Sequence, residues 1–204
     1  MRLRPEVAAL VVIALGSPLA QHADAQFVDQ SQVVVTRFNA SANRIGETFK
    51  PTQNNVAGAG AFVYNPTTSP FTALLSAELW AGGIANASGA TLIASGTQSY
   101  TLAAGASSWV DVFWSAVSVT PGTTYFLDFG SSNRSSRFGY LCCIYPNGHM
   151  YRGNSPNTSA TYAAAPETDL TYREFYVTTP EPASVALLAT GLIGVFGVAR
   201  RRKA

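Results

Sequence analysis

Charged residues and histidine are scarce in this 204-residue chain, and helical periodicity is nearly absent. Lys, Arg, Asp and Glu make up 12% of the residues, and residues 26–178 carry seven basic and eight acidic side chains, a net charge of −1. This balance excludes nucleic-acid binding through bulk charge. Outside the first 25 residues His149 is the only histidine, and no G-x-S-x-G or H-E-x-x-H spacing occurs. The sequence therefore gives no catalytic residue, cofactor or metal site.

The N-terminal residues have the order of charge, apolar core and small residues that is typical of a secretory signal peptide. Arg2 and Arg4 precede an apolar stretch over residues 7–15, and Ala23 and Ala25 form an A-x-A site. The stretch is well short of the roughly 20 residues that span a bilayer. The sequence predicts a signal peptide over residues 1–25, cleaved after Ala25. The alternative is a buried N-terminal helix.

The C-terminal residues combine two prolines, an apolar run and a basic end. Pro180, Glu181 and Pro182 precede an apolar run over residues 183–199, and the basic residues are Arg200, Arg201, Arg202 and Lys203. The prolines favour an extended backbone, which a protease can bind. As a helix the run would measure about 25 Å, marginally enough to span a bilayer. The basic residues would hold the end in the cytoplasm. We therefore predict a single transmembrane helix within residues 179–204.

This three-part order resembles the PEP-CTERM sorting signal of Gram-negative bacteria. The resemblance implies an exported precursor that is inserted transiently in the inner membrane and cut near Pro180 by an exosortase. The expected destination is the cell surface, outer envelope or extracellular matrix. Proteins with this signal tend to accompany exopolysaccharide production and biofilms. The alternative is an ordinary single-pass anchor.

Residues 26–178 have the pattern of one all-β domain. Short runs rich in Val, Thr, Tyr and Phe recur between Gly, Pro, Asn and Ser clusters, which is typical of a sandwich or barrel. Strands are expected over residues 32–38, 46–49, 56–64, 73–80, 91–95, 98–102, 108–114, 123–129, 137–145 and 170–177. A type II turn is predicted over residues 120–123, because Pro121 fixes φ and Gly122 supplies positive φ.

Segments 46–51, 117–125 and 169–175 resemble bacterial jelly-roll domains similar to carbohydrate-binding modules. The resemblance implies an antiparallel jelly-roll-like β-sandwich, and a fold alone does not give a function.

Side-chain alternation predicts which residues face the core. Tyr125, Leu127 and Phe129 share one strand face, and Asp128 is expected on the wet face. If Val110 and Val112 face the core, the side chains on either side of them line the outside. Most carboxylates are expected to be solvated.

Exposed aromatic residues next to polar ones suit sugar binding, because sugar rings stack on aromatic faces while polar groups bind the hydroxyls. The candidate ligand-binding residues are Trp80, Trp109, Asp111, Tyr145, Tyr151 and Arg152. The alternative is that these aromatic residues fill the sandwich core.

Cys142 and Cys143 are adjacent, in a compartment where thiols normally oxidise. Their side chains would point apart on a strand, and Cα atoms about 3.8 Å apart are closer than the usual disulfide range of about 4.4–6.8 Å. A vicinal disulfide, which needs a distorted turn, and two separate thiols both stay open.

We interpret the chain as an exported, non-catalytic surface or matrix protein that binds polysaccharide. A secreted hydrolase acting on glycans or esters is the alternative enzyme, and a structural or adhesive surface module is the alternative without a glycan ligand.

Overall fold

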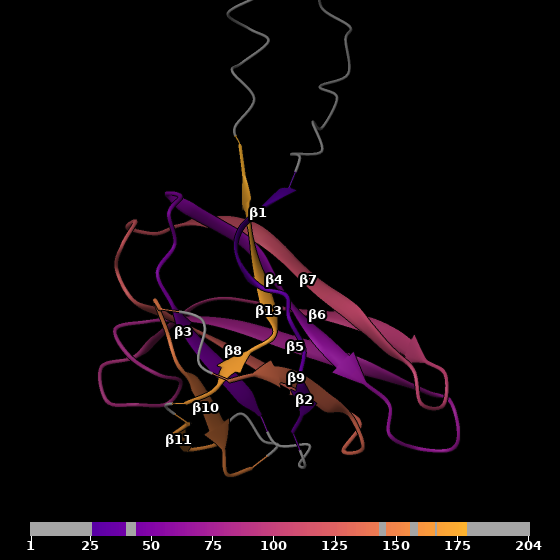
Figure 1. Ribbon diagram of the computed structural model, residues 1–204. Coiled ribbons are helices and arrows are strands. Elements are labelled where there is room, and N and C mark those ends of the chain that lie inside the picture. Colours follow the sequence, from indigo (N-terminus) through magenta and orange to yellow (C-terminus); the bar gives the residue numbers. More distant parts are fainter. Residues whose placement is uncertain (1–25, 40–43, 143–145, 156–158, 166, 179–204) are drawn as a thin grey trace, which may run out of the picture.

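The computed structural model describes residues 26–39, 44–142, 146–155, 159–165 and 167–178. These residues form two antiparallel sheets without a helix (Figure 1), which confirms the predicted all-β class and is compatible with a jelly roll. The strands are β1 (Gln26–Gln32), β2 (Arg37–Phe38), β3 (Ile45–Phe49), β4 (Asn55–Tyr64), β5 (Phe71–Ala81), β6 (Thr91–Leu102), β7 (Ser107–Ser118), β8 (Tyr125–Ser131), β9 (Arg137–Leu141), β10 (Met150–Gly153), β11 (Tyr162–Ala165), β12 (Asp169–Leu170) and β13 (Tyr172–Val177).

The first sheet, called the β4 sheet, is built around β4. Residues 58–61 of β4 pair with both β7 and β13, which therefore lie along opposite edges of this strand. Strand β9 pairs with Val63 and Tyr64 of β4, along the same edge of β4 as β13. Strand β9 also pairs with β2 and with β12. Strand β1 adds to the outer edge of β13.

The second sheet, called the β8 sheet, has the strand order β11-β10-β3-β8-β5-β6. Strands β5 and β6 form its longest pair, from Phe71 opposite Leu102 to Ala81 opposite Thr91, with a register shift between Leu79 and Trp80. All neighbours in this sheet are antiparallel.

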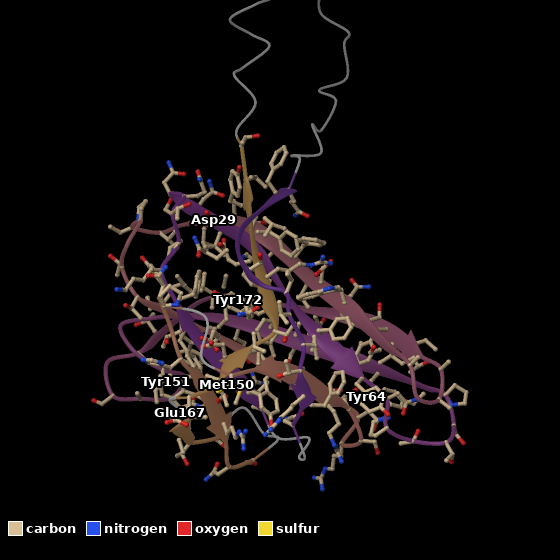
Figure 2. The ribbon with its side chains drawn as sticks, in the orientation of Figure 1. Asp29, Tyr64, Met150, Tyr151, Glu167 and Tyr172 are labelled. Atoms are coloured by element: carbon tan, nitrogen blue, oxygen red, sulfur yellow. The ribbon has the colours of Figure 1, made fainter. Side chains whose placement is uncertain are left out.

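The hydrophobic core lies between the two sheets. On β4, the core residues at 56, 59, 61 and 63 are no larger than valine and leave room for larger ones from the β8 sheet, among them Phe49, Leu75, Leu79, Leu127 and Phe129, all fully buried. Burying each such side chain contributes roughly 1.5–3 kcal/mol. Tyr172 lies in the middle of the molecule (Figure 2) and belongs to the same core. The core and both sheets lie within residues 26–178.

Several predicted boundaries were wrong. Of the strand expected over residues 32–38, only the two ends lie in strands: Gln32 is the last residue of β1, which begins at Gln26, and residues 37 and 38 form β2. The two strands expected over residues 91–95 and 98–102 are one continuous strand, β6. Strands β10 and β11 were not predicted, since each is only four residues long and surrounded by loop-type residues. The strand expected over 170–177 is interrupted at Thr171, whose backbone binds Phe62 and Gly139.

The turn prediction is confirmed. Gly122 has a φ of +76°, and the Thr123 N–H donates to the Thr120 carbonyl at 3.2 Å. Only glycine adopts such a φ at no steric cost.

The described chain begins and ends at the same end of the sandwich. Gln26 lies opposite Val177 in the β1–β13 pair. Figure 1 shows the beginning of β1 and the end of β13 together at one end of the sandwich. The predicted signal peptide (1–25, with Ala23 and Ala25) and sorting segment (179–204) lie outside the described residues. No helix in the described part of the chain is long and apolar enough to cross a membrane.

Candidate functional site

The outer face of the β4 sheet carries a row of aromatic side chains. Tyr64 stacks on Phe38 of β2 with ring centroids 4.6 Å apart, and Phe38 lies 6.3 Å from Phe62. Phe62 meets the ring of Trp109, on the neighbouring strand β7, edge-to-face at 5.5 Å. Strand β9 lies between β2 and β4, and the rings meet across its Gly139, which lies opposite Phe38 and has no side chain, so they form a continuous surface.

Arg173 of β13 extends this row. Its guanidinium carbon lies 4.5 Å from the ring centroid of Trp109 and 5.4 Å from that of Phe175. Phe175 packs edge-to-face on Phe113 at 5.0 Å. The guanidinium also binds both carboxylate oxygens of Asp111, with Nε 2.7 Å from Oδ1. Cation–π contacts and a bidentate ion pair together fix the orientation of this arginine. The eight residues Tyr64, Phe38, Phe62, Trp109, Arg173, Asp111, Phe175 and Phe113 are called the aromatic ribbon.

Two glycines of β4 make room for the aromatic ribbon. A Cβ on Gly60 would lie 2.0 Å from Asp111 Oδ1, and one on Gly58 would lie 2.6 Å from Phe113 Cδ1. Both glycines are therefore spacers beneath the side chains that come from β7 and β13.

The aromatic ribbon is partly open to solvent. Phe113 is 46% exposed, Trp109, Phe62, Phe38 and Tyr64 are half-buried, and only Phe175 is buried. Val110 and Val112 are buried in the core, which confirms that the residues between and beside them face outward. The alternative in which Trp109 fills the core is wrong.

The outer face of the β8 sheet carries a charged cluster instead. Arg44, which directly precedes β3, donates from Nε to Asp128 Oδ2 at 2.6 Å, and its Nη2 lies 2.9 Å from Glu78 Oε1. Trp80 donates from Nε1 to the other Glu78 oxygen at 3.1 Å. Arg44 and Asp128 are almost completely buried, at 3% and 1% exposure. Asp128 does point away from the core, as predicted, but the expectation that it is solvated was wrong.

Burial and charge act in opposite directions on this cluster. Burial raises the pKa of Asp128 to about 7, although the Arg44 guanidinium opposes the shift. Burial would lower the pKa of Arg44, but the Asp128 and Glu78 carboxylates outweigh it and raise that pKa. Burial also raises the pKa of the Tyr162 hydroxyl, which faces Asp128. Arg44 is therefore the cation that makes two buried or half-buried carboxylates tolerable.

A cleft lies beside the charged cluster, over β5 and β6. Its volume is about 330 Å³, and Arg44, Ser76, Glu78, Ser95, Gly96 and Thr97 line it. Ser76 lies opposite Thr97 and Glu78 opposite Ser95 in the β5–β6 register, so hydroxyl groups and a carboxylate share one face. We call this the β5–β6 cleft.

Tyr151 and Arg152 of β10 lie in different surroundings although they are adjacent. Tyr151 packs edge-to-face on the buried Phe126 at 5.6 Å and borders a second cavity of about 350 Å³. Arg152 is exposed, with its guanidinium carbon 5.5 Å from the Tyr140 ring centroid in the other sheet. Neither residue touches the aromatic ribbon or lines the β5–β6 cleft.

The structure therefore divides the candidate ligand-binding residues between two faces. Trp109 and Asp111 belong to the aromatic ribbon, whereas Trp80 and Tyr151 lie on the outer face of the β8 sheet. Figure 2 shows the separation, with Tyr64 of the aromatic ribbon far from Tyr151. Trp80, Trp109 and Tyr151 are all half-buried rather than fully buried. Tyr145 lies outside the described residues.

Cys142 directly follows β9 and is disulfide-bonded. Cys143 lies outside the described residues, so the vicinal pairing stays a prediction.

Two further carboxyl groups lie inside the sandwich, contrary to the expectation of solvated acids. Glu47 and Glu174 are both 0% exposed. Burial raises the pKa of each to about 9, and for Glu174 the nearby Asp29 adds to the shift. Asp29 itself lies near the end of the sandwich at which β1 begins (Figure 2). In the described part of the chain, no three His, Cys, Asp or Glu side chains gather as a metal site would require.

Arg44 and Arg173, the two arginines that organise the two faces, were not among the site residues predicted from the sequence. Arg173 lies between Tyr172 and Glu174 on a predicted strand, so side-chain alternation could have predicted that it points to the opposite face from these two residues. Its contact with Trp109 could not be predicted in this way, because it depends on β13 and β7 lying on opposite edges of β4.

Comparison with known protein families gives a match at the C-terminus. Residues 178–203 match the PEP-CTERM protein-sorting motif. No curated protein matches the chain with significance. The motif confirms the sorting signal inferred from Pro180, Glu181, Pro182 and the basic residues, and it supports an exported protein that an exosortase sorts through an inner-membrane precursor to the cell surface or beyond.

Proposed function

We propose that residues 26–178 are a non-catalytic, polysaccharide-binding module of the cell surface or extracellular matrix, and that the aromatic ribbon is its binding surface. The observation that carries this proposal is the continuity of the ribbon across β2, β4, β7 and β13. Each aromatic ring in the row packs against a neighbouring ring, and a row of this kind offers repeated stacking positions to a long, repetitive ligand such as a polysaccharide.

The chemistry of the aromatic ribbon suits sugar chains. Aromatic faces bind the apolar CH faces of sugar rings, and every ring here except that of the buried Phe175 keeps part of its area open to solvent while its neighbours hold it in place. Arg173 and Asp111 supply fixed donors and acceptors in the middle of the row, where sugar hydroxyls would lie. Because Arg173 is pre-oriented by two contacts, little conformational entropy is lost when a ligand binds.

The state of the carboxylates favours binding over hydrolysis. Glycoside hydrolysis uses two carboxyl groups that flank the scissile bond at separations of roughly 5–9.5 Å. Here Asp111 is ion-paired with Arg173, and Asp128 and Glu78 share Arg44. These pairings hold the carboxylates in structural roles and support the non-catalytic interpretation.

A binding test compares matched single variants of residues 26–178, which contain both sheets and the described core. Affinity electrophoresis in gels with hydroxyethylcellulose, xylan, dextran or alginate identifies a ligand for the wild type. We expect Trp109→Ala and Phe113→Ala each to weaken binding by about tenfold or more, or ~1.4 kcal/mol. The control is Leu74→Ala, a side chain of the opposite sheet that is 50% exposed, similar to Phe113.

Equal loss in Leu74→Ala and Phe113→Ala would show that the aromatic ribbon is not the site. No retardation by any polysaccharide, including exopolysaccharide purified from the producing bacterium, would refute the proposed function. Self-association that Phe113→Ala abolishes would support the adhesive alternative instead, because Phe27, Val28 and Phe113 form exposed apolar surface on the β4 sheet and its β1 edge.

A further inference from the structure

The β5–β6 cleft lies on the face of the sandwich opposite to the aromatic ribbon. Strands β5 and β6 belong to the β8 sheet, and their outward side chains at 76, 78, 95 and 97 line the cleft. The inward neighbours on β5, Leu75, Ala77 and Leu79, are in the core. The two faces are thus separated by the full thickness of the hydrophobic core.

Three hydroxyl-bearing residues, one carboxylate and one guanidinium line the cleft, while most of its exposed surface is carbon, which suits the apolar CH faces of a sugar ring. Ser95 and Thr97 each offer a hydroxyl that donates and accepts, and Glu78 offers carboxylate oxygens that accept. The Ser76 hydroxyl donates to the Gly130 carbonyl at 3.2 Å and therefore offers only acceptor capacity. The Arg44 guanidinium completes the lining and is bonded to Ser76 Oγ at 3.5 Å. Sugar hydroxyls also both donate and accept, so this set of groups matches them.

The carboxylate at the centre of the cleft is held in place before any ligand binds. One Glu78 oxygen lies 2.9 Å from Arg44 and the other accepts from Trp80. Arg44 in turn is fixed by Asp128 and lies across Gly130, where a Cβ would come within 3.2 Å of its Nη1. Each Glu78 oxygen has a second lone-pair site, so the pair can accept from two adjacent sugar hydroxyls.

Size and charge restrict the ligand. About 330 Å³ is at the small end of the roughly 300–1,000 Å³ that small-molecule sites occupy, which suits one sugar residue rather than a length of polymer. One guanidinium faces two carboxylates, so the cleft disfavours a third carboxylate from a uronic acid.

We infer that the β5–β6 cleft is a second saccharide site, specific for an uncharged sugar residue at a chain end or branch. The module then binds one chain along the aromatic ribbon and a second through the cleft, and it cross-links matrix polysaccharide. This inference rests on the proposed function of the aromatic ribbon.

A bridging assay tests the inference. Residues 26–178 are bound to an insoluble form of the polysaccharide that affinity electrophoresis identifies, and capture of a fluorescent, soluble form of the same polysaccharide is measured. We expect the wild type to capture it. Ser95→Leu with Thr97→Leu fills the cleft and should reduce capture at least about tenfold while attachment to the solid phase stays within about twofold.

Ser99→Leu with Thr101→Leu is the matched control, since both residues lie on the same face of β6 and neither lines the cleft. Ser95→Ala with Thr97→Val is the second variant, which removes the hydroxyls without added bulk and should also reduce capture. Thermal unfolding establishes that each variant is folded, and sedimentation shows that the bridging species is a monomer.

The outcomes separate the two proposals. Undiminished capture by both cleft variants, bridging only by dimers, or preferred capture of alginate would overturn the second site. A wild type that attaches but captures no second chain would overturn it too and leave the proposed function intact. A wild type that does not attach would overturn both.

Discussion

Glu47 gives a prediction whose size follows from its position inside the sandwich. It lies on β3 opposite Leu127 of the core and is 0% exposed. Its Oε2 accepts from the Leu170 N–H at 2.9 Å, and its Oε1 has no hydrogen-bond partner among the described residues. Burial raises its pKa from the ordinary 4.5 to about 9, the Leu170 N–H opposes this shift, and the Asp169 carboxylate adds to it.

A pKa that is higher in the folded state makes stability fall as pH rises. Between pH 4.5 and 9 the folded protein holds a proton on Glu47 that the unfolded chain releases. The free energy of unfolding therefore decreases by about 1.4 kcal/mol per pH unit from this group. From pH 5 to pH 7 the loss is about 3 kcal/mol, a large part of the roughly 5–15 kcal/mol that stabilises a domain.

Glu47→Gln removes this pH dependence. The amide does not titrate, and its oxygen still accepts from the Leu170 N–H. We expect the variant to match the wild type near pH 5 and to exceed it by about 3 kcal/mol at pH 7. Urea unfolding followed by tryptophan fluorescence at pH 5, 6, 7 and 8 measures the difference, and Glu167→Gln, at an exposed carboxyl, controls for net charge. Parallel stability profiles for Glu47→Gln and wild type would refute the reasoning.

Gly60→Ala places a methyl group on Asp111 and should lower the free energy of unfolding by about 1–3 kcal/mol, measured in urea, with weaker polysaccharide binding; unchanged binding would contradict the spacer role. Arg44→Met leaves Asp128 unpaired and should cost about 3–5 kcal/mol at pH 8 and less at pH 5, where Asp128 takes up a proton; a pH-independent loss would contradict this account. The intact mass of the exported protein should lack residues 183–199, and a mature protein that retains them would contradict exosortase processing.

Alternation along single strands was enough to predict much of the fold. Val110 and Val112 fixed the outward direction of Trp109 and Asp111, and Pro121 with Gly122 fixed a turn. These predictions held because they depend on neighbours in the chain, which a sequence displays directly.

The functional faces depend on contacts between residues far apart in sequence. Arg173 of β13 binds Asp111 of β7 over Gly60 of the intervening strand β4. Arg44, next to β3, pairs with Glu78 of β5 over the intervening strand β8, which carries Asp128. Strand order determines these contacts, and no local pattern reveals it. The same limit explains Asp128, which faces outward as predicted but is buried together with Arg44 on the outer face of the sheet.

The pairing of the first strand with the last has a consequence for export. Strand β1 has no partner in the described fold other than β13, more than 100 residues later in the chain. During secretion the N-terminal strand must therefore wait until nearly the whole domain has emerged across the membrane. In that interval the segment that becomes β1 has no strand partner, so the edge of β13 that it later covers is also open until the sandwich closes.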